Sequence, residues 1–236
     1  MTKGKLYLIP VPLGENADVS RVIPEYNKDI INSIDEYVVE NEKTARRFLK
    51  QMGLTKPLQD IKLLVLNEQT EIQDIQYYLT PAEKGLNIGL MSEAGCPGVA
   101  DPGAELVKLA HKKNIDVVPL VGPSSILMAL MASGMNGQNF CFNGYLPKEQ
   151  KDRIHKLKEL ERLALKNNQT QLFIETPYRN NHVIDDVLKN CNGETRFCIA
   201  CDISLPTESI KTQTISDWKK HKPDINKRPA LFLIGL

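Results

Sequence analysis

The stretch Ile88-Gly-Leu-Met-Ser-Glu-Ala-Gly-Cys-Pro-Gly-Val-Ala-Asp-Pro-Gly103 carries the strongest indication of fold class in this chain. An apolar run over 87–91 leads directly into a loop with three glycines and two prolines, and helical spacing resumes over 104–111. Open α/β sheets build ligand sites from this order of strand, loop and helix, because glycine lets backbone N–H groups approach a ligand closely. A second such loop, Val121-Gly-Pro-Ser-Ser125, opens another helix. Together the two loops predict a small-molecule site in an α/β fold.

Short apolar segments alternate with helical segments over the first half of the chain. The first expected helix covers Ser20–Ile34, with Pro24 in its first turn, where proline is tolerated. Strands are expected at 5–9, 37–39, 63–66, 87–91 and 115–119. Such alternation predicts a mostly parallel, doubly wound sheet.

The pattern changes after residue 121. Strands are expected at 171–175, 196–202, 209–214 and 230–234, with a helix over 180–191 between the first two. Successive strands with few crossovers indicate a mixed sheet. We therefore predict two α/β domains, 1–120 with the mostly parallel sheet and 121–236 with the mixed sheet.

Composition and charge suit a globular protein. The chain has 236 residues, 42% apolar and 25% charged, and its longest apolar run, Ile126–Ala132, is too short to span a bilayer. We expect a cytoplasmic protein without a membrane partner. Residues 1–144 carry 14 Lys and Arg against 17 Asp and Glu, a net −3, whereas residues 145–236 carry 16 against 12, a net +4. This asymmetry permits a polyanionic partner near the second half without requiring one.

The absence of known motifs excludes several kinds of functional site. The sequence contains neither a P-loop, a dinucleotide fingerprint after the first strand, a GxSxG elbow nor an HExxH pair. Cys198 and Cys201 form a lone CxxC in a segment that we expect to be a strand. Residues three apart on a strand face opposite sides, so we interpret both cysteines as buried thiols and expect no metal site.

A charged helix over 42–52 has two open interpretations. Its four cations, Lys43, Arg46, Arg47 and Lys50, are spaced i, i+3, i+4 and i+7 and so share one face. The face either lies in water or contacts the phosphate backbone of a nucleic acid. Ser124 and Ser125, at a predicted helix start, are similarly open to a capping role, an anion-binding role or both.

Two further motifs, taken with the two glycine-containing loops, make the chain similar to a known family. Together with Phe140-Cys-Phe-Asn-Gly-Tyr-Leu-Pro147 and Phe173-Ile-Glu-Thr-Pro-Tyr-Arg179, the two loops resemble the tetrapyrrole-methylase-like (class III) S-adenosylmethionine-dependent methyltransferases. Within them the chain looks similar to the branch that methylates a cytidine ribose 2′-hydroxyl in small-subunit ribosomal RNA. The resemblance covers nearly the whole chain. It implies two α/β domains, S-adenosylmethionine as cofactor, a homodimer, and ribosomal RNA or the small ribosomal subunit as partner.

The resemblance also implies site residues. The expected cofactor contacts are Pro12, Leu13, Gly14, Ser92, Ala94, Gly95, Cys96, Ser124, Ser125, Glu175, Thr176 and Cys201. A hydroxyl acceptor must lose its proton, so the expected catalytic residues are Glu93 and Glu40 as candidate bases, with Lys43 beside them. Glu93 could instead bind the cofactor's ammonium, and Glu40 could only anchor its helix. The expected RNA contacts are Arg46, Arg47, Lys50 and Arg179.

The motifs depart from that branch in places. Ser92-Glu-Ala-Gly-Cys-Pro97 replaces its usual Ser-Asp-Ala-Gly-Thr-Pro, and Glu40-Asn-Glu-Lys43 replaces its Glu-Asp-Thr-Arg. The sequence also ends at Leu236, from which we expect the branch's extra carboxy-terminal segment to be missing. Two alternatives therefore stay open. One is methylation of a tetrapyrrole or other small molecule, and the other is a non-catalytic module that binds S-adenosylmethionine.

Overall fold

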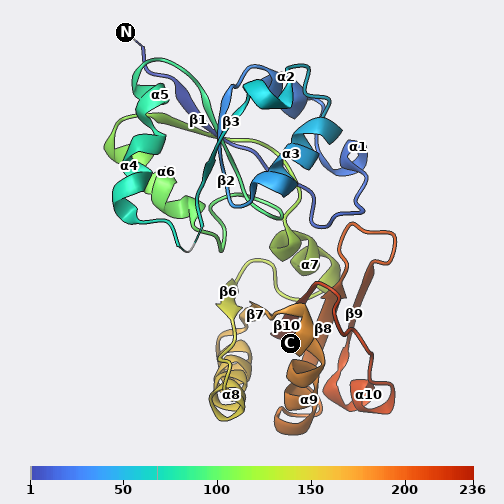
Figure 1. Ribbon diagram of the computed structural model, residues 1–236. Coiled ribbons are helices and arrows are strands. Elements are labelled where there is room, and N and C mark those ends of the chain that lie inside the picture. Colours follow the sequence, from blue (N-terminus) through green and yellow to red (C-terminus); the bar gives the residue numbers. More distant parts are fainter. Residues whose placement is uncertain (1, 68) are drawn as a thin grey trace. The chain divides into compact units, whose positions relative to one another are not determined.

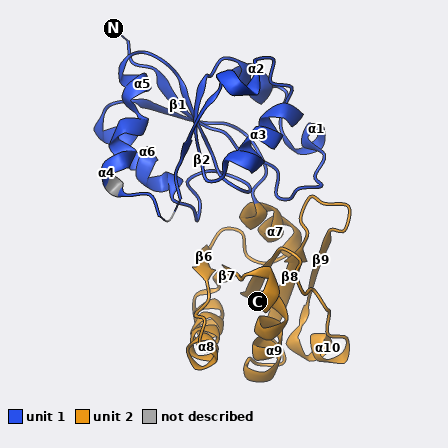
Figure 2. Ribbon diagram, in the orientation of Figure 1, with its two compact units in different colours: residues 1–124 blue, residues 125–236 orange. Residues whose placement is uncertain are grey.

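The computed structural model describes residues 2–67 and 69–236. The chain forms two compact units, residues 1–124 and residues 125–236, shown in blue and orange in Figure 2. The boundary thus lies four residues after the one expected from the sequence, between 120 and 121. We refer to the two parts as unit 1 and unit 2 and describe each by itself.

Unit 1 contains a five-stranded parallel sheet in the order β3-β2-β4-β1-β5. Strand β4 lies at the centre of this sheet, and it is fully buried because helices cover both faces. Figure 1 shows the helices between residues 19 and 51 (α1 to α3) on one face and those between residues 72 and 112 (α4 to α6) on the other. This arrangement confirms the predicted doubly wound sheet. The strands are β1 (Lys5–Leu8), β2 (Glu36–Val39), β3 (Lys62–Val65), β4 (Ile88–Met91) and β5 (Asp116–Pro119).

The helices of unit 1 follow the expected alternation with one correction, and the short helices η1 (Leu58–Asp60) and α5 (Thr80–Glu83) were not expected. The single helix expected over 20–34 is wrong: the structure has two helices there, separated at Pro24. Proline disfavours helical backbone in the residue before it, and Ile23 is accordingly extended, with φ −114° and ψ 123°. The helices are α1 (Val19–Val22), α2 (Tyr26–Asn32), α3 (Glu42–Gln51), η1 (Leu58–Asp60), α4 (Ile72–Tyr78), α5 (Thr80–Glu83) and α6 (Gly103–Lys112).

Helix α3 begins where its sequence provides a cap. The Asn41 side chain accepts hydrogen bonds from the backbone N–H groups of Lys43 and Thr44, at 2.9 and 3.4 Å. Phe48 and Leu49 of α3 are buried in a core with Tyr37 of β2. The amphipathic pattern therefore fixes which face of α3 is turned away from the sheet, and the charged residues lie on that face.

Unit 2 contains a five-stranded mixed sheet in the order β6-β7-β10-β8-β9. Strands β6 and β7 are parallel, and the other neighbours are antiparallel, which confirms the predicted mixed sheet. Phe173, Phe232 and Phe197 stack across three strands in its core, with ring centroids 5.6 and 5.9 Å apart. The strands are β6 (Phe140–Tyr145), β7 (Thr170–Ile174), β8 (Arg196–Cys201), β9 (Ser209–Thr214) and β10 (Ala230–Gly235).

Three elements of unit 2 were not expected from the sequence: β6, α10 and the single-turn helix η2 (Pro177–Arg179). Strand β6 contains Asn143-Gly144, a pair typical of turns, and its register with β7 shifts between Phe142 and Tyr145. Helix α10 is only six residues long, too short for a periodic signal. The helices are α7 (Ser125–Ser133), α8 (Gln150–Asn167), η2 (Pro177–Arg179), α9 (Asn180–Asn190) and α10 (Ile215–Lys220).

The sequence also led us to expect no membrane-spanning segment and two buried thiols on one strand. Within the described residues, no helix combines the length and apolar character needed to cross a membrane. Cys198 and Cys201 lie on β8 and are both buried free thiols, as interpreted from their spacing. Burial raises the pKa of each thiol to about 11.

Candidate functional site

Three loops of unit 1 meet at the carboxyl edge of its sheet. Val11 and Gly95 exchange backbone hydrogen bonds of 3.0 and 3.1 Å, which join the loop after β1 to the loop after β4. The Cys96 thiol donates to the Pro123 carbonyl at 3.4 Å, which joins the second loop to the loop after β5. The structure thus brings together the expected cofactor contacts of unit 1. Parallel α/β sheets place their ligands at this edge.

Glycine permits this close approach. Gly95 has φ +74°, and a Cβ added there would lie 3.2 Å from Leu13 Cδ2 and 3.5 Å from the Pro123 carbonyl oxygen. A Cβ at Gly122 would lie only 2.3 Å from the Cβ of Pro10. The Ser92 hydroxyl is within 3.3 Å of the carbonyl oxygens of Ala94 and Gly95 and can donate to either. The three loops are therefore packed backbone to backbone, which leaves few side chains at the edge.

A pocket of about 140 Å³ opens beside these loops, between the loop after β1 and helix α3. It combines apolar and polar side chains and contains residues from all three predicted classes of site residue. The lining residues are Val11, Pro12, Gly14, Glu15, Thr44, Ala45, Arg47, Phe48, Gln51, Ser92 and Glu93. Thr44, Phe48 and Gln51 were not expected from the sequence, because only folding places that face of α3 against the loop after β1.

Glu40 and Glu93 lie next to each other at the ends of β2 and β4. The backbone N–H of Glu93 donates to Glu40 Oε1 at 3.3 Å, and the Thr44 hydroxyl donates to Glu93 Oε1. Burial raises the pKa of Glu40, and the nearby negative charges of Asp101 and Glu93 raise it further. A carboxylate with a raised pKa is a better proton acceptor, which is the property that a general base needs.

Asp101 is a third carboxylate that the sequence analysis did not select. Both of its oxygens accept from the Gly98 N–H at 2.9 Å, and Oδ1 accepts from the Gly103 N–H at 2.8 Å. Burial raises the pKa of Asp101, although these hydrogen bonds act against the rise. The signal that could have revealed it is the order Asp-Pro-Gly at a helix start, where an aspartate commonly caps backbone N–H groups.

The four expected cations of α3 are not equivalent. Lys43 and Lys50 are exposed. Arg46 donates to the Leu58 carbonyl at 2.9 Å and pairs with Glu42 at 3.4 Å, while Arg47 pairs with Glu15 at 3.0 Å beside the pocket. The two arginines are thus held by neighbours, and the two lysines extend into solvent.

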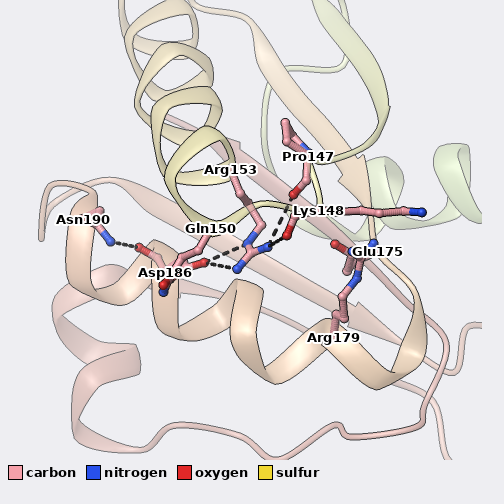
Figure 3. A network of polar contacts seen from close by, with 8 residues as sticks. All are labelled: Pro147, Lys148, Gln150, Arg153, Glu175, Arg179, Asp186 and Asn190. Atoms are coloured by element: carbon pink, nitrogen blue, oxygen red, sulfur yellow. Dashed lines mark hydrogen bonds and ion pairs between the residues drawn. The ribbon is translucent and has the colours of Figure 1, made fainter.

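In unit 2, two expected site residues are bound to each other. The Glu175 side chain is fully buried, and its Oε1 accepts from the Thr176 N–H at 2.7 Å and pairs with Arg179. Arg179 also lies 3.3 Å from the Thr176 hydroxyl. Figure 3 shows the Glu175–Arg179 pair just after β7. Glu175 Oε2 has no hydrogen-bond partner among the described residues, so this buried oxygen could accept from a ligand.

The remaining expected contacts have different surroundings. The Cys201 side chain lies in the core of unit 2, so a ligand could reach this residue only through its backbone. Ser125 is the first residue of α7, and Ser124 precedes it. Asp202, directly after β8, has φ +51° and accepts from Thr207 and Arg228 at 2.6 and 2.8 Å.

A buried ion pair fixes the loop between β6 and α8. Arg153 Nε and Nη2 each lie 2.8 Å from Asp186 Oδ2, and Gln150 donates to Asp186 Oδ1 at 2.9 Å. Arg153 Nη1 donates to the Lys148 carbonyl at 2.8 Å (Figure 3). Sequence analysis missed this network because an arginine in a polar helix gives no sign of being buried.

The sequence pattern of the family described as "Tetrapyrrole (Corrin/Porphyrin) Methylases" matches residues 5–218. The chain belongs to this family. It is therefore an S-adenosylmethionine-dependent methyltransferase, as the resemblance implied.

Relatives and solved structures agree with the family. The chain is 30% identical to "Ribosomal RNA small subunit methyltransferase I" of Vibrio cholerae serotype O1, over 97% of this chain and 76% of the relative. The protein of the same name from Escherichia coli O157:H7 is 29% identical, over 99% and 78%. The fold resembles that of the methyltransferase CobJ, with a TM-score of 0.65 and 17% identity over 98% of this chain and 94% of the other.

Each unit, taken by itself, offers groups that the cofactor of this family could use. Unit 1 has a loop edge of backbone groups and small side chains, closely packed around Gly95. In unit 2, the buried Glu175 Oε2 could accept a hydrogen bond from a hydroxyl or amino group of a ligand.

Proposed function

We propose that this methyltransferase modifies a cytidine ribose 2′-hydroxyl in the RNA of the small ribosomal subunit. The observation that carries the proposal is the similarity, over nearly the whole chain, to relatives named as ribosomal RNA small subunit methyltransferases. The pocket beside Glu93 supports it, because polar and apolar groups together suit a nucleoside.

The cofactor contacts that we propose come from the loops of each unit. S-adenosylmethionine supplies an electrophilic methyl group when bound. In unit 1 the contacts are Pro12, Leu13, Gly14, Ser92, Ala94, Gly95, Cys96 and Ser124. In unit 2 they are Ser125, Glu175, Thr176 and the backbone of Cys201. Their task is to fix the donor in line with the acceptor oxygen and to exclude water, and such positioning can supply several kcal/mol of barrier reduction.

Glu40 and Glu93 are the proposed groups for proton removal. Glu93 lines the pocket and is held by the Thr44 hydroxyl, so it can receive the proton of a hydroxyl placed there. Glu40 accepts from the Glu93 backbone and has a raised pKa, which makes it the second candidate. Lys43, at the start of α3, is proposed to place the substrate phosphate near them.

Phosphate contacts are proposed for Arg46, Arg47, Lys50 and Arg179. Lys50 is exposed and can reach a phosphate directly. The three arginines already hold protein groups, so they would have to share their remaining N–H groups with RNA. We also propose a homodimer and a cytoplasmic location, to be tested by light scattering and by cell fractionation.

Transfer of a tritiated methyl group tests the proposed function. Small ribosomal subunits would be purified from cells that lack this gene and incubated with the protein and labelled S-adenosylmethionine. The expected product after nuclease digestion is labelled 2′-O-methylcytidine from a single site. Labelling of a tetrapyrrole instead of RNA would contradict the proposed acceptor. Donor binding without transfer to either would favour a binding module.

A further inference from the structure

A group of side chains in unit 2 lies outside the site residues named above. It consists of Tyr145, Lys148, Tyr178 and Lys227, and we call it the tyrosine–lysine surface. Tyr145 is the last residue of β6 and is paired in register with Ile174, the last residue of β7. Tyr178 follows four residues after Ile174, in η2. The two tyrosines therefore lie at the carboxyl ends of adjacent parallel strands.

Both tyrosine rings are open to solvent. Tyr178 is 70% exposed and Tyr145 is 60% exposed, although folding usually covers much of a large aromatic side chain. Two exposed aromatic rings at one end of a strand pair are more typical of a binding surface than of a region that merely supports the fold.

Lys227 is held beside one of these rings. Its Nζ lies 5.9 Å from the centroid of the Tyr178 ring, and its backbone N–H donates to the Pro177 carbonyl at 3.0 Å. Lys227 has φ +62°, a conformation that costs free energy for a residue other than glycine and is kept only where the surroundings impose it. The structure thus places a cation at an exposed aromatic ring by a defined backbone geometry.

Lys148 adds a second cation from the loop after β6. Its carbonyl accepts from Arg153, so the buried Arg153–Asp186 pair fixes the backbone from which the lysine side chain extends. In Figure 3 the Lys148 side chain runs away from that pair. The same end of the β6–β7 strand pair therefore carries exposed rings and exposed cations.

We propose that the tyrosine–lysine surface binds single-stranded RNA, with bases stacked on Tyr178 and Tyr145 and phosphates at Lys227 and Lys148. Proteins bind single strands by combining aromatic side chains, on which bases stack, with cations that follow the backbone. The net charge of +4 over residues 145–236 favours such a polyanion. The inference rests on the proposed function, in that it assigns to an RNA substrate a second area of contact away from the pocket of unit 1.

Fluorescence anisotropy with a fluorescein-labelled oligouridine measures this binding directly. Tyr178→Ala is expected to raise the Kd by about 5- to 150-fold, the range for loss of one stacked base. Tyr178→Phe keeps the ring and should bind as the wild type does. Tyr77→Ala removes an equally exposed ring (66%) from α4 of unit 1 and should leave the Kd unchanged.

The salt dependence of binding tests the cations. Lys227→Gln should reduce the slope of log Kd against log salt concentration by about 0.7, the value for one phosphate contact on a single strand. Lys219→Gln, a matched change on α10, should leave the slope as it is. Circular dichroism and calorimetric binding of S-adenosylhomocysteine would show that each variant is folded.

Three results would overturn the inference. One is an unchanged Kd of Tyr178→Ala for oligouridine. If this variant bound only the intact small subunit more weakly, the surface would contact a ribosomal protein and not RNA. The second is a wild type that does not bind oligouridine. Methyl transfer to small subunits by the wild type is measured separately. The third is methyl transfer at the wild-type rate by both Tyr178→Ala and Lys227→Gln. It would show that this surface does not bind the RNA substrate, and it would not contradict the proposed function.

Discussion

Arg153 and Asp186 form a buried ion pair in unit 2, with Nε and Nη2 of the arginine each 2.8 Å from Asp186 Oδ2. The pair connects α8 to α9 and also holds the carbonyl of Lys148. Because both side chains are almost fully buried, neither can be solvated if its partner is removed. The loop after β6 therefore depends on a contact between two helices.

Replacing one member of this pair should strongly destabilise the protein. Arg153→Ala is expected to lower the free energy of unfolding by about 3–5 kcal/mol, since it leaves the Asp186 carboxylate buried without a counter-ion. Urea denaturation would measure the change. Arg162→Ala, at an exposed position of the same helix, should change stability by only about 0.5 kcal/mol. Equal effects of the two substitutions would show that burial of Arg153 has no energetic role.

Gly95→Ala should weaken donor binding as well as stability. Positive φ alone costs about 1 kcal/mol for alanine, and the added Cβ would also press on Leu13 and on the Pro123 carbonyl. Gly98→Ala is the matched control, because Gly98 also has positive φ (+81°), but no atom of the described residues lies within 4 Å of an added Cβ. We expect both variants to lose stability and only Gly95→Ala to bind S-adenosylhomocysteine more weakly by calorimetry. Equal binding by the two would argue against a donor site at this loop.

Glu40→Gln should change how stability depends on pH. Burial and the charges of Asp101 and Glu93 raise the pKa of Glu40, so the folded protein retains this proton to higher pH than the unfolded chain does. The contribution of Glu40 to stability is therefore fully present below its unfolded pKa of about 4.5 and is lost as pH rises through the folded pKa.

Urea denaturation at several pH values checks this expectation. Relative to the wild type, Glu40→Gln should gain stability as pH rises from about 4.5 towards neutral pH, because only the wild type must then ionise a partly buried carboxyl group. Glu25→Gln, a change at an exposed position, should show no such trend. A constant difference between Glu40→Gln and wild type across this range would contradict the assigned cause.

In the methyl-transfer assay Glu93→Gln should lose most activity if Glu93 removes the proton.

A double variant can separate the ion pair of Arg179 with Glu175 from the phosphate contact that we propose for Arg179. Arg179→Ala should lower the free energy of unfolding by about 2 kcal/mol or more, since the buried Glu175 carboxylate loses its counter-ion. Adding Glu175→Gln removes the charge and should restore much of that stability. RNA affinity should stay reduced in the double variant if Arg179 also contacts phosphate. Full recovery of RNA affinity with stability would leave Arg179 only a structural role.

The sequence predicted the two sheets because each rests on local periodicity. The alternation of strands and helices up to β5 indicates a parallel sheet, and the run of strands after β7 indicates a mixed one. Errors arose where one or two residues override periodicity: Pro24 divides α1 from α2, and the turn-forming pair Asn143-Gly144 concealed β6.

Local motifs by themselves determined the fold class, the family and the loops that meet at Gly95, because glycine and proline restrict the backbone wherever they occur. Only the tertiary structure decided that Thr44 holds Glu93 and that Arg153 is buried against Asp186. It also decided that Glu175 Oε2 has no hydrogen-bond partner in the part of the chain that the structure describes. These contacts join residues about 30 to 50 positions apart or depend on complete burial. Their free energy comes from packing and desolvation, which exist only once the sheets and helices have assembled.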